Sequence, residues 1–268
     1  MAKSDYIELE TRVKLSAIWI LAKREILGFY RNKARIISTL AQSILFLIIF
    51  SAGFVQLDII IDGITIDSRA FVASGIIAMA ILFSGVFGGL GVIRDKMFGF
   101  LQELLVAPVS RRVLMMGKTL GVALQSLMQC FTILGVSVAL GFFGYRWDLI
   151  WRAFILMGPA LLFSIGVVGI GLVVSTRVTD FQSFGLIQTF LIMPMFWFSG
   201  ALFAFNTVPL FMQVIIMINP ISYGVDIFRF ILLGVSYFPL WLNLSVLGIF
   251  GICLILLGAY SFSKLEIS

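Results

Sequence analysis

The polar side chains that could perform chemistry in this sequence are few, and most stand alone among apolar residues. Asp226 and Arg229 are spaced i, i+3, so they lie on one face of a helix and can pair. We expect an ion pair that fixes a short helix at the external surface of a membrane. The alternative is a direct role in binding a substrate or moving a proton.

A second polar set lies within one long apolar stretch. Gln125, Gln129 and Thr132 recur at helical spacing and therefore share one face. Polar residues within membrane spans usually face the helix bundle or a water-filled cavity. Two interpretations follow: hydrogen bonding between helices, or the lining of a translocation path.

Several kinds of catalytic and cofactor chemistry have no residues to support them. The sequence contains no histidine, which is the commonest metal ligand and general base. It has no GxxxxGK[ST] loop to cradle nucleotide phosphates. Asp95, Glu103 and Asp180 are too scattered to form a metal-binding cluster for a membrane-embedded enzyme. We therefore expect no catalytic, cofactor-binding or metal site in this chain.

The elements that must position these residues are membrane spans. Of 268 residues, 61% are hydrophobic and 12% are charged, whereas soluble domains are about half apolar and a quarter charged. Gly85 and Gly89 allow close helix approach, within the chain or across a dimer. Six apolar runs reach the roughly 20 residues that cross a bilayer, and they lie near 36–55, 70–93, 113–140, 153–175, 181–203 and 241–260.

The basic residues indicate the orientation of these spans. With six spans both termini share a side, and that side holds all of the 19 lysines and arginines except Arg69, Arg146, Arg152 and Arg229. Positive loops stay in the cytoplasm, so both termini are expected there. This distribution explains the net charge of +6 without nucleic acid. Lys118, near the start of the third span, is expected to extend its ammonium to the interface.

The first 35 residues precede the spans and are amphipathic. A basic helix with tryptophan on its apolar side lies in the plane of the membrane surface. Packing on a soluble partner is the alternative. The apolar positions at helical spacing are Leu15, Ile18, Trp19, Ala22, Ile26 and Phe29.

The one sizeable cytoplasmic loop that we expect, 94–112, is predicted to contain a short apolar helix. Pro108 ends it, and Ser110 is placed to cap the third span. A helix that exposes leucines needs a cover, and this chain has no soluble domain to supply it. We expect a cytoplasmic partner, with the lipid headgroups as the alternative.

The segment 204–238 is apolar but broken by Pro209 and by Asn219–Pro220. Two short helices result, over 208–218 and 222–233, and neither is long enough to cross a bilayer. We expect them to re-enter the membrane from the external side. Ser222 is expected to cap the second helix, and Gly234 to end it.

Two of these segments together resemble a known family. The loop and span QELLVAPVSRRVLMMGKTLG and the late stretch FWFSGALFAFNTVPLFMQVIIMINPISYGVDIFRFILLG are similar to signatures of ABC-2 type transporter permeases. The signatures stand in the family's order, and span number and length also match. The resemblance implies an all-α integral membrane protein of six spans, with an interfacial N-terminal helix, a cytoplasmic coupling helix and two external re-entrant helices.

The resemblance also implies a function and partners. The chain would be the permease subunit, and not an enzyme, of an exporter that moves a drug, lipid or glycolipid across the cytoplasmic membrane. Two separate ATPase subunits would bind ATP and Mg, and a second copy or a paralogous permease would complete the dimer. The helix over 98–107 would contact the ATPase, and the residues expected near that contact are Gln102, Glu103, Leu104, Leu105, Pro108 and Arg111.

Three alternatives remain at this stage. Polysaccharide-export permeases of the same superfamily have similar lengths. An ATP-independent channel or ion-coupled carrier would need no partner, although such carriers usually place carboxylates or histidines within spans. A membrane-embedded lipid transferase is the third and would need the metal cluster that the acidic residues do not form.

Overall fold

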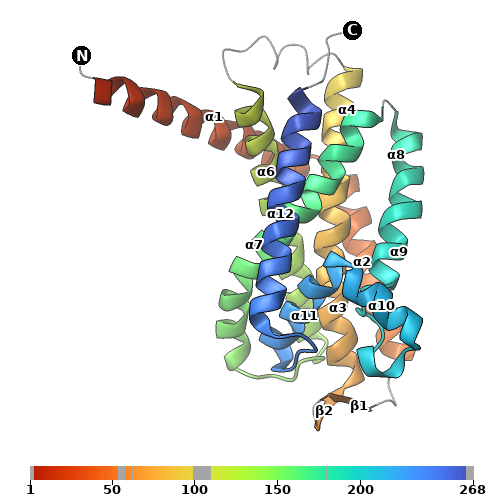
Figure 1. Cartoon of the computed structure of the whole chain (residues 1–268). Coiled ribbons are helices and arrows are strands. Elements are labelled where there is room, and N and C mark those ends of the chain that lie inside the picture. Colours follow the sequence, from red (N-terminus) through yellow and green to blue (C-terminus); the bar gives the residue numbers. More distant parts are fainter. Residues whose placement is uncertain (1–2, 54–57, 62, 99–109, 179, 264–268) are drawn as a thin grey trace.

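The protein is a bundle of long helices, described by a computed structural model for residues 3–53, 58–61, 63–98, 110–178 and 180–263 (Figure 1). This confirms the all-α membrane fold. The elements are α1 Lys3–Arg31, α2 Lys33–Gly53, β1 Asp58–Ile61, β2 Ile64–Asp67, α3 Ser68–Phe87, α4 Gly89–Met97, α6 Arg111–Ala139, α7 Asp148–Arg177, α8 Phe181–Ile187, a π-helical turn Gln188–Ile192, α9 Met193–Trp197, a 3-10 turn Phe205–Thr207, α10 Leu210–Ile218, α11 Pro220–Leu233 and α12 Leu240–Ser263.

Five stretches are helical, long and apolar enough to cross a membrane, and each coincides with a predicted span. They are Ile36–Gly53, Ser68–Met97, Val113–Ala139, Asp148–Arg177 and Leu240–Ser261. α1 starts and α12 ends at one end of the bundle, which we call the terminal end. The β1–β2 hairpin lies at the other, the hairpin end (Figure 1). The sequence did not predict this hairpin, whose turn uses Gly63 at a φ of 78°.

The fifth predicted span, 181–203, differs from the expected continuous helix. It is divided into α8, the π-helical turn and α9, of seven, five and five residues, and it ends at Trp197. Pro194, in the first turn of α9, has no N–H to donate and so breaks the hydrogen-bond ladder where the π-helical turn ends. This irregular helix is therefore shorter than the other spans.

α10 and α11 meet at an angle of 90°. The cap at this corner is Asn219 and not Ser222 as predicted, because its side chain accepts a hydrogen bond from the amide of Ile221 at 3.0 Å. The same side chain donates to the carbonyl of Met195 at 2.6 Å, which ties the corner to α9. Gly234 ends α11 in the left-handed conformation, as predicted.

α3 is the central helix, and every residue from Ala70 to Val86 is buried. Its continuation into α4 approaches α7 closely because a Cβ atom on Gly89 would collide with the backbone of Gly171. On the other side of α7, Gly166 contacts Phe250 of α12. These glycines therefore bring together helices of the same chain.

α1 leaves the bundle at the terminal end (Figure 1). Leu21, Ala22 and Phe29, in its C-terminal half, are buried, whereas the predicted apolar residues Leu15 and Trp19 remain exposed. The exposed part retains the composition of a membrane-surface helix.

Candidate functional site

A cluster of charged side chains, most of them buried, joins α1, α4 and α6 next to the loop between α4 and α6. We call Arg24, Glu25, Asp95 and Lys118 the charge cluster. Lys118 pairs with Asp95 and lies 3.5 Å from Glu25, and Arg24 donates to Asp95 at 3.1 Å. The side chain of Lys118 is only 3% exposed. The expected extension of Lys118 to the interface is therefore wrong, because two carboxylates hold the ammonium inside.

Two glycines of α6 allow α1 to reach this cluster. A Cβ atom on Gly117 would lie 2.6 Å from Cβ of Leu21, and one on Gly121 would lie 2.7 Å from Cβ of Glu25. Real Cβ atoms do not approach so closely, so side chains at these positions would push α1 away. The Gly-Lys-x-x-Gly sequence of α6 thus places both the docking surface and the buried cation at one helix crossing.

Lys96 fastens α4 to α7 at the same end. Its ammonium donates to the carbonyls of Ser175 at 2.8 Å and Thr176 at 3.0 Å. These carbonyls belong to the last turn of α7, where a cation also complements the helix dipole. α4 is therefore anchored by charged groups to three other helices.

The loop with the predicted coupling residues connects α4 to α6. Gln102, Glu103, Leu104, Leu105 and Pro108 lie outside the described residues, as does the side chain of Arg111. The predicted cap of the third span is present, since the hydroxyl of Ser110 accepts a hydrogen bond from the amide of Val113 at 3.4 Å. The residues that flank the loop on both sides thus belong to one tightly connected unit.

The polar residues of the third span separate into two environments. Gln125 and Gln129 are buried, and the amide nitrogens of both lack a hydrogen-bond partner within the described part of the chain. Thr132 is exposed and donates to the carbonyl of Met128 at 2.8 Å. The expected hydrogen bonds of these amide nitrogens to neighbouring helices are therefore absent among the described residues. Their role in lining a path stays a prediction.

The predicted ion pair between Asp226 and Arg229 does not form. Arg229 instead donates to the carbonyls of Gly200 at 2.8 Å and Ala201 at 3.1 Å. Its guanidinium also lies 3.6 Å from the ring centroid of Phe71 on α3. The two side chains point to different neighbours because α11 is buried between α3 and α12, not exposed at an interface.

Asp226 holds the connection between α11 and α12. Its carboxylate accepts hydrogen bonds from the amides of Tyr237 at 2.9 Å and Phe238 at 3.1 Å, and from the side chain of Asn243 at 2.8 Å. Such bonds to an ionised acceptor are stronger than those between neutral groups. Asp226 and Arg229 therefore fasten the bent helix pair to the bundle.

We expect Asp226→Asn to lower the free energy of unfolding by about 1–3 kcal/mol, because an amide nitrogen would face donors where a carboxylate oxygen accepts. The measurement is the thermal unfolding midpoint of the purified protein in detergent. Asp67→Asn is the matched control, since Asp67 caps α3 at the exposed hairpin end and asparagine caps helices equally well. Equal unfolding midpoints for the two variants would contradict the role of Asp226 in holding α11 to α12.

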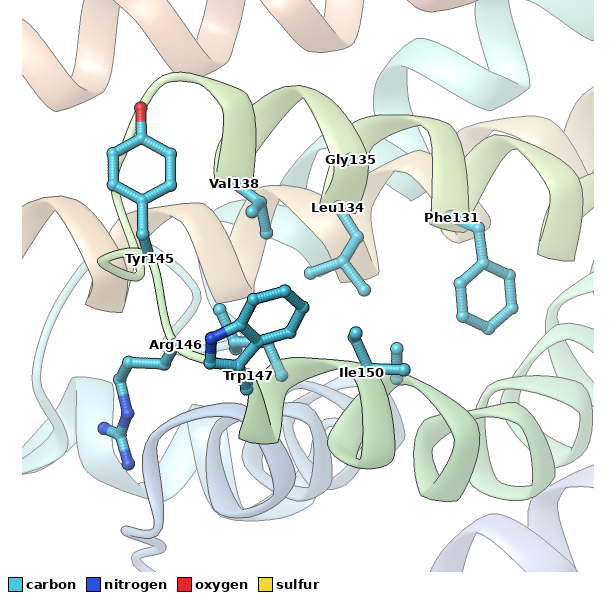
Figure 2. Close-up of a pocket in the computed structure, with 10 residues that line it drawn as sticks. Phe131, Leu134, Gly135, Val138, Tyr145, Arg146, Trp147 and Ile150 are labelled. Carbon is cyan, nitrogen blue, oxygen red and sulfur yellow. The ribbon is translucent and has the colours of Figure 1, made fainter.

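An apolar groove of about 560 Å³ opens between the end of α6 and the start of α7 at the hairpin end. Phe131 and Leu134 of α6 point toward α7, and Trp147 and Ile150 point back across the groove (Figure 2). Arg146 lies at its edge and pairs with Asp148 at 2.8 Å. The groove can hold an apolar chain beside a charged rim.

Comparison with known proteins places these features in a family. The sequence pattern of the ABC-2 type transporter family matches residues 16–233. A transport permease named ycf38 from Pyropia yezoensis is 28% identical over 83% of this chain and 76% of its own length. The inner membrane transport permease YadH of Escherichia coli is 27% identical over 67% of this chain and 69% of its own. Nodulation protein J of Rhizobium leguminosarum is 24% identical over 81% and 82%.

The charge cluster is the feature that sequence reasoning missed. Its members come from positions as far apart as Glu25 and Lys118, so no local motif contains them. The available signal was the pair of glycines on either side of Lys118, together with two carboxylates, Glu25 and Asp95, next to apolar runs.

Proposed function

This chain belongs to the ABC-2 type transporter family, and from that premise we propose that it is the permease subunit of an ATP-binding cassette exporter. It carries an amphiphilic cargo, such as a drug, lipid or glycolipid, out across the cytoplasmic membrane. ATP is bound and hydrolysed by separate cytoplasmic subunits, and a second permease subunit completes the path. Both termini are cytoplasmic, so the terminal end of the bundle faces the ATPase.

The observation that carries this proposal is the charge cluster beside the cytoplasmic loop. Asp95 and Lys118 stand just before and just after the loop and pair with each other, and Glu25 draws α1 into the same contact. A force applied to the loop reaches α4, α6 and α1 together, because packed helices move as units and do not deform continuously. A rigid connection of this kind suits a subunit whose helices move because a partner binds and hydrolyses ATP.

In the proposed cycle, ATP binding closes the partner subunits and draws the two loops toward each other. α4 and α6 follow, and the spans tilt so that the cargo leaves between the two permeases. Nucleotide acts here by favouring one of two arrangements of the bundle. The buried amide nitrogens of Gln125 and Gln129, which lack protein partners in the described chain, suit a lining that admits water.

One observation supports an amphiphilic cargo. The groove between α6 and α7 is lined mainly by apolar side chains and carries Arg146 at its edge. We therefore propose a lipid-linked or drug-like cargo. Export of a polysaccharide is the second candidate, and it would require a more polar surface than the mainly apolar lining of this groove.

The test uses the loop itself. We expect Glu103→Arg or Leu105→Asp to reduce cargo-stimulated ATP hydrolysis and transport by at least about tenfold, because either change alters the helix predicted over 98–107, which we propose contacts the ATPase. The measurement is ATPase activity and cargo flux in liposomes that contain the permease with its ATPase. The purified yield of both variants should equal that of the unmodified protein.

Asn206→Ala is the matched control, since Asn206 is exposed in the 3-10 turn Phe205–Thr207, which lies between α9 and α10 and is remote in sequence from the loop. Transport at the unmodified rate by the loop variants would overturn the coupling assignment. Flux that is independent of nucleotide would instead favour a channel or an ion-coupled carrier.

A further inference from the structure

A basic cavity of about 390 Å³ lies between α1 and α4 at the terminal end. It is separate from the groove described above, which lies at the hairpin end. Lys23, Arg24 and Arg31 of α1 and Arg94 of α4 supply its cations, and Ile20 and Leu27 supply apolar surface.

Most of the positive charge in this cavity has no counterion within the described chain. Arg24 is bonded to Asp95, and Glu25 faces Lys118. Among the described residues, Lys23, Arg31 and Arg94 form neither a hydrogen bond nor an ion pair through their side chains. Three cations around one cavity repel one another unless an anion is present. The electrostatics of the cavity therefore favour a negatively charged ligand.

The apolar residues beside these cations indicate what kind of anion it is. Ile20, Lys23, Leu27 and Arg31 follow one face of α1, and Ile20 and Leu27 are 65% and 45% exposed. The opposite face of the helix, with Ala22 and Phe29, is buried against the bundle. A face that alternates exposed apolar residues with cations matches the boundary between lipid headgroups and acyl chains.

We infer that this cavity binds the phosphate of an anionic phospholipid from the leaflet at the terminal end. Lys23, Arg31 and Arg94 contact the phosphate, while Ile20 and Leu27 contact the first carbons of an acyl chain. Since Arg94 belongs to α4 and the other two cations to α1, the bound lipid links these helices from outside, as the charge cluster links them from inside. The inference does not depend on the proposed transport cycle.

The experiment measures lipid retention by the full chain in nanodiscs of equal parts phosphatidylglycerol and phosphatidylcholine. After extraction into detergent, native mass spectrometry counts the lipids that stay bound. The unmodified protein should retain phosphatidylglycerol preferentially. The triple variant Lys23→Gln, Arg31→Gln, Arg94→Gln should lose this preference by at least about tenfold, since each cation near a lipid surface contributes separately.

The matched control is the triple variant Lys14→Gln, Lys33→Gln, Arg177→Gln, which removes the same charge from positions that line neither this cavity nor the groove between α6 and α7. It should keep the preference for phosphatidylglycerol. If both variants lose the preference for phosphatidylglycerol equally, the lipid responds to overall positive charge, and the proposed binding site is wrong. An unchanged preference in the cavity variant would overturn it as well.

Two further arms separate this lipid from other ligands. Inorganic phosphate added in excess should not displace phosphatidylglycerol, because it lacks the acyl chain that contacts Ile20 and Leu27. Displacement by phosphate would reassign the cavity to a free anion. Loss of the ATPase from the purified complex of the cavity variant, with phosphatidylglycerol still bound, would reassign it to a protein contact.

Discussion

Lys118→Met is expected to lower the free energy of unfolding by about 3–5 kcal/mol, because it leaves the buried carboxylate of Asp95 without its closest cation. Glu25, 3.5 Å from the same ammonium, loses its partner too. The substitution removes charge but keeps an unbranched side chain of similar length, so packing is largely retained. The measurement is the unfolding midpoint in detergent, followed by ATP-dependent transport of whatever protein remains folded.

A double-mutant cycle separates the ion pair from the burial of each charge. Asp95→Asn alone should destabilise the protein, and Asp95→Asn with Lys118→Met should cost less than the sum of the single changes. The difference measures coupling across the pair. Strict additivity of the two losses would show that Asp95 and Lys118 do not act on each other, and the joint between α4 and α6 would then need another explanation.

Gly121→Ala is expected to displace α1 from α6 and to destabilise the protein by about 1–3 kcal/mol, as overpacking does in a tight interface. The added methyl group would lie 2.7 Å from Cβ of Glu25 and 2.9 Å from Cα of Ala22. The backbone of α1 must move to relieve this overlap. Because Glu25 belongs to the charge cluster, the displacement also separates it from Lys118.

Limited trypsin digestion reports the position of α1 directly, since its many basic residues become accessible when it leaves the bundle. Gly121→Ala should accelerate cleavage within α1. Gly248→Ala is the matched control, because a Cβ atom there meets nothing within 4 Å. That variant should be neutral or slightly more stable, since alanine favours helix over glycine. Identical digestion of the two variants would refute the docking role of Gly121.

The spans that the sequence predicts well are those set by one long apolar run. α3, α7 and α12 follow from residue type alone, because lipid requires each backbone group to be satisfied within its own helix. The prediction of a continuous helix for the fifth span was less accurate, since the π-helical turn at Gln188–Ile192 depends on how Pro194 is accommodated.

The contacts within the bundle could not be predicted in the same way. Asp226 and Arg229 have the spacing of an ion pair, yet each finds better partners in segments that lie elsewhere in the chain. Lys118 has the position of an interfacial lysine, yet it is drawn inward by Asp95 and Glu25. Spacing along the sequence indicates which side chains can form an ion pair. Tertiary packing determines which partners they actually contact.

The charge cluster also has a consequence for the order in which the protein is assembled. Glu25 is synthesised long before Lys118, and Asp95 lies between them in the chain. α1 therefore leaves the ribosome with a carboxylate whose buried counterion does not yet exist. α1 can pack in its final position only after the third span is inserted, because Lys118 and Gly121 both belong to that span. α1 is thus synthesised before α6 but reaches its final position only after α6 is in place.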